Sequence, residues 1–154
     1  MKQIDQDLIQ KMCKTAAESP RLRSHHNIHD DLEEDIQRLL IGMQPGTYIR
    51  PHYHPEEYKK EMIILLQGAC TCVTFDKEGN ITGSTHLSRD KSMICEFPDQ
   101  QFHSLICTEK DTVVLEVKRG PYIPLEAKCF AEWSPESESE ASEYIQRLIE
   151  FTEA

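Results

Sequence analysis

The sequence lacks two features that would point to common classes of partner. No apolar run approaches the ~20 residues that a membrane-spanning helix needs. Basic residues are too few to attract phosphate backbones, because 17 lysines and arginines stand against 27 acidic residues and give a formal net charge of -10. We therefore expect neither a membrane nor a nucleic acid as a partner. The 154 residues fit one domain of ordinary size.

Also missing are a CxxC pair and a signal peptide. The six cysteines lie mostly in apolar stretches, at positions 13, 70, 72, 95, 107 and 129. We therefore expect reduced, buried thiols and a cytoplasmic location. Cys70 and Cys72 could share one face of a strand and bind a metal, but core packing is the stronger interpretation.

The central part of the chain has the pattern of an all-β protein. From residue 37 to residue 118, short apolar or alternating runs are separated by turn sequences such as "DKEGN" and "SRDK". That many short strands at close spacing predict an antiparallel sandwich or barrel.

Helical periodicity appears at both ends of this region. Residues 5–18 carry apolar side chains at helical spacing and end before Pro20. Ser137 and Glu140 predict a capping box for a second helix within 138–151. Our predicted division of this single domain is an N-terminal helix and arm (1–30), a barrel with its return segment (31–135) and a C-terminal helix (136–154).

Four residues with metal-binding side chains surround the predicted strands. His52 and His54 are two positions apart, so on an extended strand both side chains reach the same point. Imidazole pairs of this kind commonly bind a divalent transition metal. Glu61 opens the following apolar strand, where a buried carboxylate needs a partner such as a metal. His103, at the start of a much later strand, is the fourth candidate.

The order of these residues resembles the two motifs of the cupin superfamily, in which a double-stranded β-helix (jelly roll) holds a metal inside the barrel. The first motif, G(X)5HXH(X)3-4E(X)6G, matches residues 46–68 except for a loop of six residues, "PEEYKK". In the second motif, G(X)5PXG(X)2H(X)3N, Pro98 and His103 fit, whereas Gln100 and Cys107 replace the usual glycine and asparagine.

A narrower resemblance covers roughly residues 3–130. The stretches "SPRLRSHHNIH", "QRLLIGMQPGTYIRPHYHP" and "VVLEVKRGPY" are similar to the WbuC family of cupin-fold metalloproteins. This resemblance implies that His52, His54, Glu61 and His103 are the metal ligands. Members of that family occur beside genes for bacterial polysaccharide and nucleotide-sugar synthesis, and their reaction is unassigned.

A site of three histidines and one carboxylate leaves positions open on Zn, Ni, Mn or Fe(II), where a carbonyl, hydroxyl or water can bind. Our first hypothesis is a small metal-dependent enzyme, of isomerase or epimerase type, acting on an anionic sugar or nucleotide-sugar metabolite. The second is a non-catalytic cupin that binds metal and a small ligand as a sensor or regulator. The third is an Fe(II) dioxygenase. Pairing through sheet edges, common in cupins, leads us to expect a homodimer.

Arginines near the ligands predict how a small anionic metabolite would be bound. Guanidinium groups bind carboxylate or phosphate in a bidentate way. The candidates are Arg21, Arg23, Arg38 and Arg50, although each could equally form a surface salt bridge. The histidines at 25, 26 and 29 are expected to form local hydrogen bonds, with a smaller chance that one lines the pocket.

Overall fold

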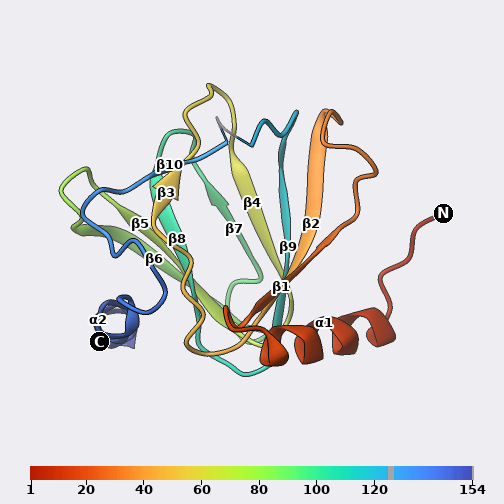
Figure 1. Ribbon diagram of the computed structural model, residues 1–154, viewed down its shortest axis with the longest axis horizontal. Helices are drawn as coiled ribbons and strands as arrows, with labels where there is room; N and C mark the ends of the chain where they lie inside the picture. The colour runs from red at the N-terminus through yellow and green to blue at the C-terminus, as the bar shows by residue number, and fades with distance from the viewer. Residues whose placement is uncertain (125–126, 154) are drawn as a thin grey trace.

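The computed structural model describes residues 1–124 and 127–153 and contains ten strands and two helices over those ranges (Figure 1). In chain order the elements are α1 (Gln6–Glu18), β1 (Arg23–Asn27), β2 (Ile36–Met43), β3 (His52–Tyr53), β4 (Glu61–Gln67), β5 (Cys70–Phe75), β6 (Ile81–Leu87), β7 (Ile94–Phe97), β8 (Phe102–Cys107), β9 (Thr112–Arg119), β10 (Cys129–Phe130) and α2 (Ser142–Glu153).

The strands form two five-stranded antiparallel sheets that face each other. One sheet has the order β1-β2-β9-β4-β7, and the other has the order β10-β3-β8-β5-β6. From β4 onward the chain crosses between the sheets at every connection except that between β5 and β6, which pair with each other. This arrangement confirms the predicted all-β jelly-roll core with a helix at each end (Figure 1). The sheets extend beyond the predicted range 37–118, because β1 pairs with β2 and β10 pairs with β3.

Helix α1 covers one end of the first sheet. The side chain of Asp5 caps its first turn by accepting a hydrogen bond from the Leu8 N–H at 3.0 Å, and the helix ends before Pro20 as predicted. Ile9 and Cys13 pack against Val113 of β9. Gly42 allows the close approach of β2, because a Cβ there would lie 3.1 Å from the Met12 carbonyl oxygen.

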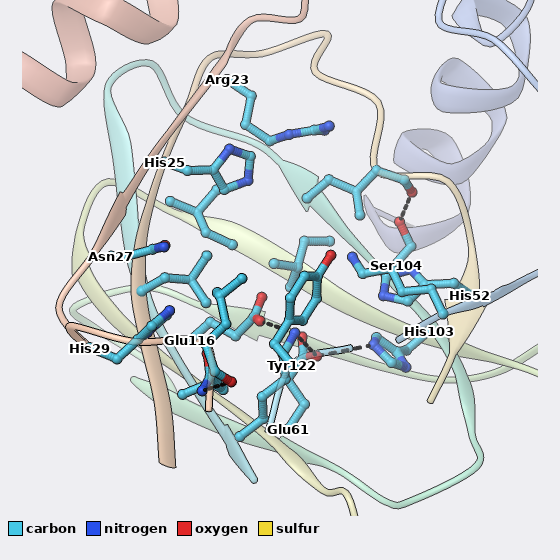
Figure 2. Close-up of a pocket in the computed structure, with 18 residues that line it drawn as sticks. Arg23, His25, Asn27, His29, His52, Glu61, His103, Ser104, Glu116 and Tyr122 are labelled. Carbon is cyan, nitrogen blue, oxygen red and sulfur yellow. Dashed lines mark hydrogen bonds and ion pairs between the residues drawn. The ribbon is translucent and has the colours of Figure 1, made fainter. Parts of the chain in front are cut away.

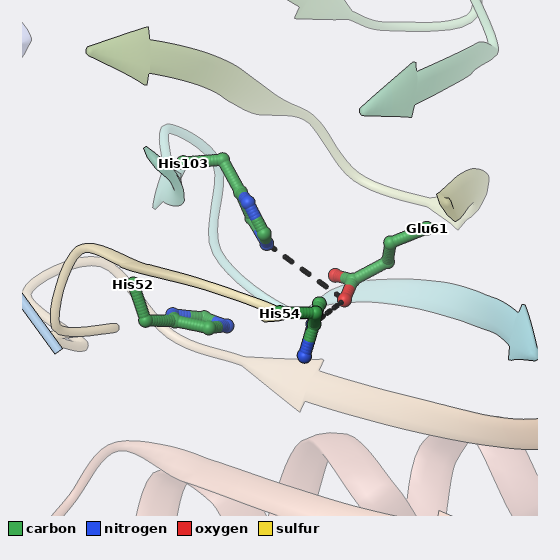
Figure 3. Close-up of side chains that lie close together, drawn as sticks. All are labelled: His52, His54, Glu61 and His103. Carbon is green, nitrogen blue, oxygen red and sulfur yellow. Dashed lines mark hydrogen bonds and ion pairs between the residues drawn. The ribbon is translucent and has the colours of Figure 1, made fainter. Parts of the chain in front are cut away.

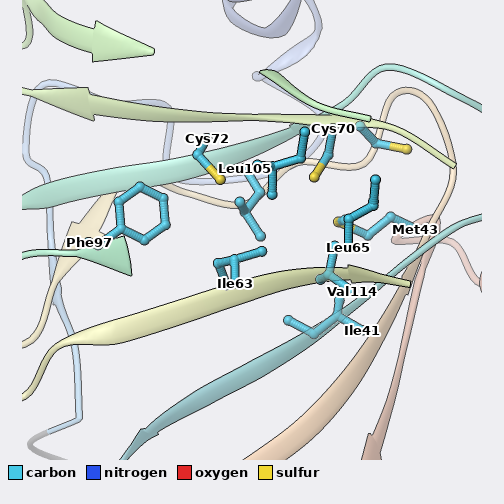
Figure 4. Close-up of a cluster of buried hydrophobic side chains, with 11 residues drawn as sticks. Ile41, Met43, Ile63, Leu65, Cys70, Cys72, Phe97, Leu105 and Val114 are labelled. Atoms are coloured by element: carbon cyan, nitrogen blue, oxygen red, sulfur yellow. The ribbon is translucent and has the colours of Figure 1, made fainter. Parts of the chain in front are cut away.

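The hydrophobic core lies between the two sheets (Figure 4). Its members are the inward-facing apolar residues of six strands together with three cysteines: Ile41, Met43, Ile63, Leu65, Cys70, Cys72, Leu87, Phe97, Leu105, Cys107 and Val114. All six cysteines are free thiols, as expected, and Cys70 and Cys72 lie in this core. Among the described residues, no helix is long and apolar enough to cross a membrane.

The C-terminal helix starts later than predicted. The capping box was wrong, because the hydroxyl of Ser137 lies 3.0 Å from the Ser139 hydroxyl, and Glu140 donates its own N–H to the Ser137 carbonyl within a turn. Helix α2 begins at Ser142 instead. Tyr144 and Leu148 face the second sheet, where they pack with Val73, Phe75 and Ile106.

Candidate metal centre

The four predicted ligands converge between the two sheets (Figure 3). His52 lies on β3 and faces His103 of β8 in the strand register, while His54 follows β3 directly. Glu61 is the first residue of β4 in the opposite sheet. One ligand atom from each residue lies within 4.8 Å of the others, and all four side chains are buried. The alternation of side chains along an extended chain explains how His52 and His54 reach the same point.

Backbone carbonyl groups orient the three imidazole rings. The Nδ1 atom of His52 lies 2.9 Å from the Arg50 carbonyl oxygen, that of His103 lies 2.7 Å from the Gln101 carbonyl oxygen, and that of His54 bonds to the Ala127 carbonyl. A carbonyl oxygen only accepts, so each Nδ1 is a donor. In the neutral ring this leaves the Nε2 lone pair free, which is the usual arrangement of metal-binding histidines.

The Nε2 atoms lack suitable partners without a cation. Those of His52 and His103 are buried and form no hydrogen bond with the described residues. That of His54 lies 2.7 Å from Glu61 Oε2, and that of His103 lies 3.7 Å from the same oxygen. A neutral Nε2 lone pair facing a carboxylate oxygen is unfavourable, whereas a divalent ion would satisfy both groups. The residues present therefore fit a divalent transition metal such as Zn, Ni, Mn or Fe, and the cluster could bind one.

The local charges keep the ligands in the protonation states that a metal needs. Burial alone raises the pKa of Glu61, but its surroundings, above all the ammonium group of Lys118, lower it by more, so the carboxylate is ionised. Burial, with Lys128 and His103, holds the pKa of His52 well below its ordinary value, so that ring stays neutral. Metal binding requires both of these forms.

A cavity of about 300 Å³ opens beside the cluster (Figure 2). His52, Glu61 and His103 form one part of its wall, and the rest is mixed polar and apolar. Glu116 and Lys118, consecutive inward-facing residues of β9, form an ion pair within it. Lys118 Nζ also lies 3.7 Å from Glu61 Oε2, so one chain of charges joins the cavity to the cluster.

The predicted arginines occupy three different environments. Arg23 lines the cavity beside the cluster. Arg21 and Arg50 lie in an adjoining hollow of about 420 Å³, which Arg23 and Lys128 also line. Arg38 is outside both, because it lies between two inward-facing residues of β2 and pairs with Glu34 on the other face. The structure therefore brings three of the four to the region of the cluster.

Several cavity residues were missed by the sequence reasoning. Glu116 and Lys118 alternate with Val and Leu in "TVVLEVKR", a pattern that normally places charged side chains in solvent. Lys128 follows a proline-rich stretch with no recognisable pattern. His25 and His29, expected to form local bonds, both line the cavity. The one available signal was the density of polar residues in "RSHHNIH".

The loop before His103 accounts for one departure from the cupin motif. Gln100 stands where glycine is usual, and its φ of 59° lies in the left-handed region that glycine adopts most easily. Its side-chain amide donates to the Pro55 carbonyl at 3.1 Å, which ties this turn to the chain after the HxH pair. The turn that positions His103 is thus retained without glycine.

Several solved structures of cupin type share the fold of this chain. CapF from Staphylococcus aureus, a capsular polysaccharide assembling protein, aligns with a TM-score of 0.59 at 17% identity, over 71% of this chain and 30% of that one. KdgF from Halomonas sp. aligns with a TM-score of 0.53 at 16% identity, over 68% of this chain and 84% of that one. An oxalate oxidase in complex with the substrate analogue glycolate aligns with a TM-score of 0.56 at 13% identity. The match covers 73% of this chain and 56% of the oxidase, so it spans about half of that enzyme.

Fold and cluster together define a protein with a cupin-type jelly-roll fold and a buried three-histidine, one-glutamate site. Residues 4–87 match the family described as a domain of unknown function (DUF6016), and the chain belongs to that family. None of the curated proteins compared with the chain matches it.

Proposed function

We propose that His52, His54, Glu61 and His103 bind one divalent transition metal, and that the protein is a small metal-dependent enzyme acting on an anionic sugar or a nucleotide-sugar-related metabolite. The observation that carries this proposal is the set of three imidazole rings, each fixed through Nδ1 by a backbone carbonyl, around one ionised carboxylate. An arrangement that leaves buried Nε2 atoms unpaired costs stability, which a binding role explains.

The reaction class that fits best is isomerisation or epimerisation. A metal bound at this site would supply Lewis-acid polarisation of a substrate carbonyl or hydroxyl oxygen. Glu116 lines the same cavity and is the base that we propose for moving a proton. Lys118 holds the Glu116 side chain in place through their ion pair. Burial lowers the pKa of Lys118, but the carboxylates of Glu116 and Glu61 raise it by more, so Lys118 stays charged.

Sequence resemblance supports the sugar chemistry and a narrower family. The stretches shared with the WbuC family include the HxH pair and the "RSHHNIH" strand, both of which lie at the cavity. CapF, with a similar fold, is named as a capsular polysaccharide assembling protein. We infer from these that the chain is of the WbuC type and serves polysaccharide biosynthesis.

We also retain the proposals of a cytoplasmic location and a homodimer. Six free cysteines suit a reducing compartment. Strand β7 is the edge of the first sheet, and Met93 and Ile94 beside it are about half exposed, at 49% and 54%. An exposed apolar edge of this kind is suited to pairing with a second copy.

The proposed activity can be tested by proton exchange. Metal-loaded protein in D₂O would be incubated with a panel of anionic sugars and nucleotide sugars, and deuterium incorporation beside the carbonyl or hydroxyl carbon would be followed by NMR. We expect exchange with at least one compound, loss of it after chelation, and loss of it in Glu116→Gln with metal content unchanged.

Two other results would contradict the isomerase proposal. Binding of metal and ligand without any exchange or conversion would indicate the non-catalytic sensor. Oxygen consumption that occurs only with Fe(II) would indicate the dioxygenase.

A further inference from the structure

Strand β1 presents a row of polar side chains to the cavity (Figure 2). Arg23, His25 and Asn27 alternate along the strand, so they share one face, and His29 continues the row just beyond it. We call these four residues the β1 ladder. Neighbouring members of a strand face are about 6.6–6.8 Å apart, so the ladder places polar groups along the length of the cavity.

His29 ends the ladder with an unpaired hydrogen-bonding group. Its side chain is only 7% exposed, and its Nε2 has no partner among the described residues. His29 Nδ1 lies 3.0 Å from the Arg38 backbone nitrogen and 2.8 Å from the Arg38 carbonyl oxygen. The Arg38 backbone thus occupies Nδ1 in either tautomer, which leaves Nε2 as a buried polar atom at the cavity wall without a partner among the described residues.

Two cations at the other end of the cavity have no ion-pair partner among the described residues. Arg23 donates to the Tyr48 carbonyl at 2.7 Å, and neither Arg23 nor Lys128 forms an ion pair with a described residue. The buried lysines 59 and 118, by contrast, each pair with a glutamate. Two cations that face one cavity without an ion pair to any described residue are the arrangement expected of an anion site.

Burial is the largest cause of a lowered pKa at Arg23, His25 and Lys128, and neighbouring cations add to it. Burial and then Arg21 lower the pKa of Arg23 to about 10. Burial by neighbouring atoms, followed by Arg23 and Lys128, lowers the pKa of His25 to about 4, although the side chain remains accessible to solvent. Burial is the main cause of a lowered pKa for Lys128; Lys118 and Arg23 add to it, whereas Glu116 and Glu61 oppose it. A bound anion would relieve this repulsion.

We propose that the β1 ladder and Lys128 recognise a polyhydroxylated anion the size of one monosaccharide. Arg23 and Lys128 bind its carboxylate or phosphate, and His25, Asn27 and His29 bind its hydroxyl groups, which leaves another oxygen of the ligand facing the metal cluster. This inference rests on the proposed function in that it names the ligand class of the same cavity. None of the residues it uses is a metal ligand.

The dimensions of the site limit the ligand. A volume of about 300 Å³ is at the lower end of the ~300–1,000 Å³ that small-molecule sites usually have, so one sugar ring fits and a nucleotide does not. In the adjoining hollow, Glu138 pairs with Arg21 at 2.7 Å and Glu136 lies 3.9 Å from Arg50. The two arginines that line only this hollow are therefore already engaged by acids, whereas the polar groups of the ladder are available, so the ladder favours the monosaccharide.

Calorimetric titration of the full chain with defined probes tests the proposal. We expect D-glucuronate or D-glucose 6-phosphate to bind at least tenfold more tightly than D-glucose, and the stronger of the two identifies carboxylate or phosphate as the anion. Arg23→Gln should weaken binding of that anion at least tenfold, because a charged hydrogen bond is lost. Arg119→Gln is the matched control, since Arg119 is an exposed residue at the end of β9.

A second pair of variants tests the ladder itself. His25→Gln should weaken binding, whereas His26→Gln should not, because His26 lies on the same strand and does not line the cavity. Equal binding of glucose and the two anions, tighter binding of a nucleotide sugar, or unchanged binding in Arg23→Gln would each overturn the proposal.

Metal content, measured in every sample, separates this inference from the proposed function. Bound metal without anion binding would refute the ladder and leave the metal centre standing. Anion binding that depends on Arg23 in a protein with no affinity for metal would support the ladder and refute the metal centre.

Discussion

Replacing Glu61 by glutamine would separate the structural and metal-binding roles of this buried carboxylate. Its Oε2 lies 2.7 Å from the Nε2 atom of His54, whose lone pair faces it in the neutral ring. A glutamine amide would donate to that lone pair, for a net gain of about 0.5–1.5 kcal/mol, and would remove a buried charge. Lys118 would keep its ion pair with Glu116. We therefore expect the free energies of unfolding of the metal-free variant and the metal-free wild type to differ by no more than about 1 kcal/mol. Breaking a buried ion pair typically costs ~3–5 kcal/mol instead.

The response to metal should differ strongly between the two proteins. At a metal concentration of about 100 times Kd, binding stabilises the wild type by about 2.7 kcal/mol, which corresponds to roughly 5–11 °C in Tm for a chain of this size. If loss of the anionic ligand weakens binding about a hundredfold, the same concentration stabilises the variant by about 0.4 kcal/mol, or roughly 1–2 °C.

Thermal unfolding followed by circular dichroism, with chelator and with each of Zn, Ni, Mn and Fe(II), measures both quantities. Glu78→Gln makes the same chemical change at an exposed position and should retain the full metal response. Two results together would refute this reasoning: a free energy of unfolding several kcal/mol below wild type for metal-free Glu61→Gln, and an increase in Tm on adding metal that equals the wild-type increase.

Three further predictions concern pH, the cysteines and assembly. The metal-free protein should lose stability as pH falls from about 6.5 to about 4. The pKa of His25 is about 4 in the folded protein and near 6.5 in the unfolded chain, so the unfolded chain binds more protons in this range. Urea unfolding should show a smaller loss of stability over the same pH range for His25→Gln. Thiol titration of denatured, unreduced protein should find six free groups, and a lower count without handling oxidation would contradict the reduced state. Ile94→Lys, at the exposed β7 edge, should convert a dimer to a monomer in light scattering, and a wild type that is already monomeric would end the dimer proposal.

The ligand cluster could be predicted because its signal is local. His52 and His54 obey the period of an extended chain, and Glu61 and His103 each start an apolar strand at cupin spacing. The helix of residues 6–18 was equally accessible, since its buried residues follow the helical period closely.

The remaining cavity residues depend on tertiary structure, which no local pattern encodes. Strand β1 reads "RSHHN" and has no apolar residue, so only its pairing with β2 makes it a strand. Glu116 and Lys118 face inward because the cavity, with its polar wall, replaces the hydrophobic core at that level of the sheet. Alternation alone assigns such residues to the outside. Arg38 shows the opposite case, in which closeness in sequence does not become closeness in space.

Elemental analysis of protein purified without added metal tests the central claim most directly. After dialysis against a weak chelator, plasma emission should find about one divalent transition metal ion per wild-type chain. His52→Ala and His103→Ala should retain far less while keeping the β-rich circular dichroism of the fold, since each removes one of four converging ligand atoms. Equal metal content in all three proteins, or none in the wild type even after metal is supplied, would contradict the metal centre.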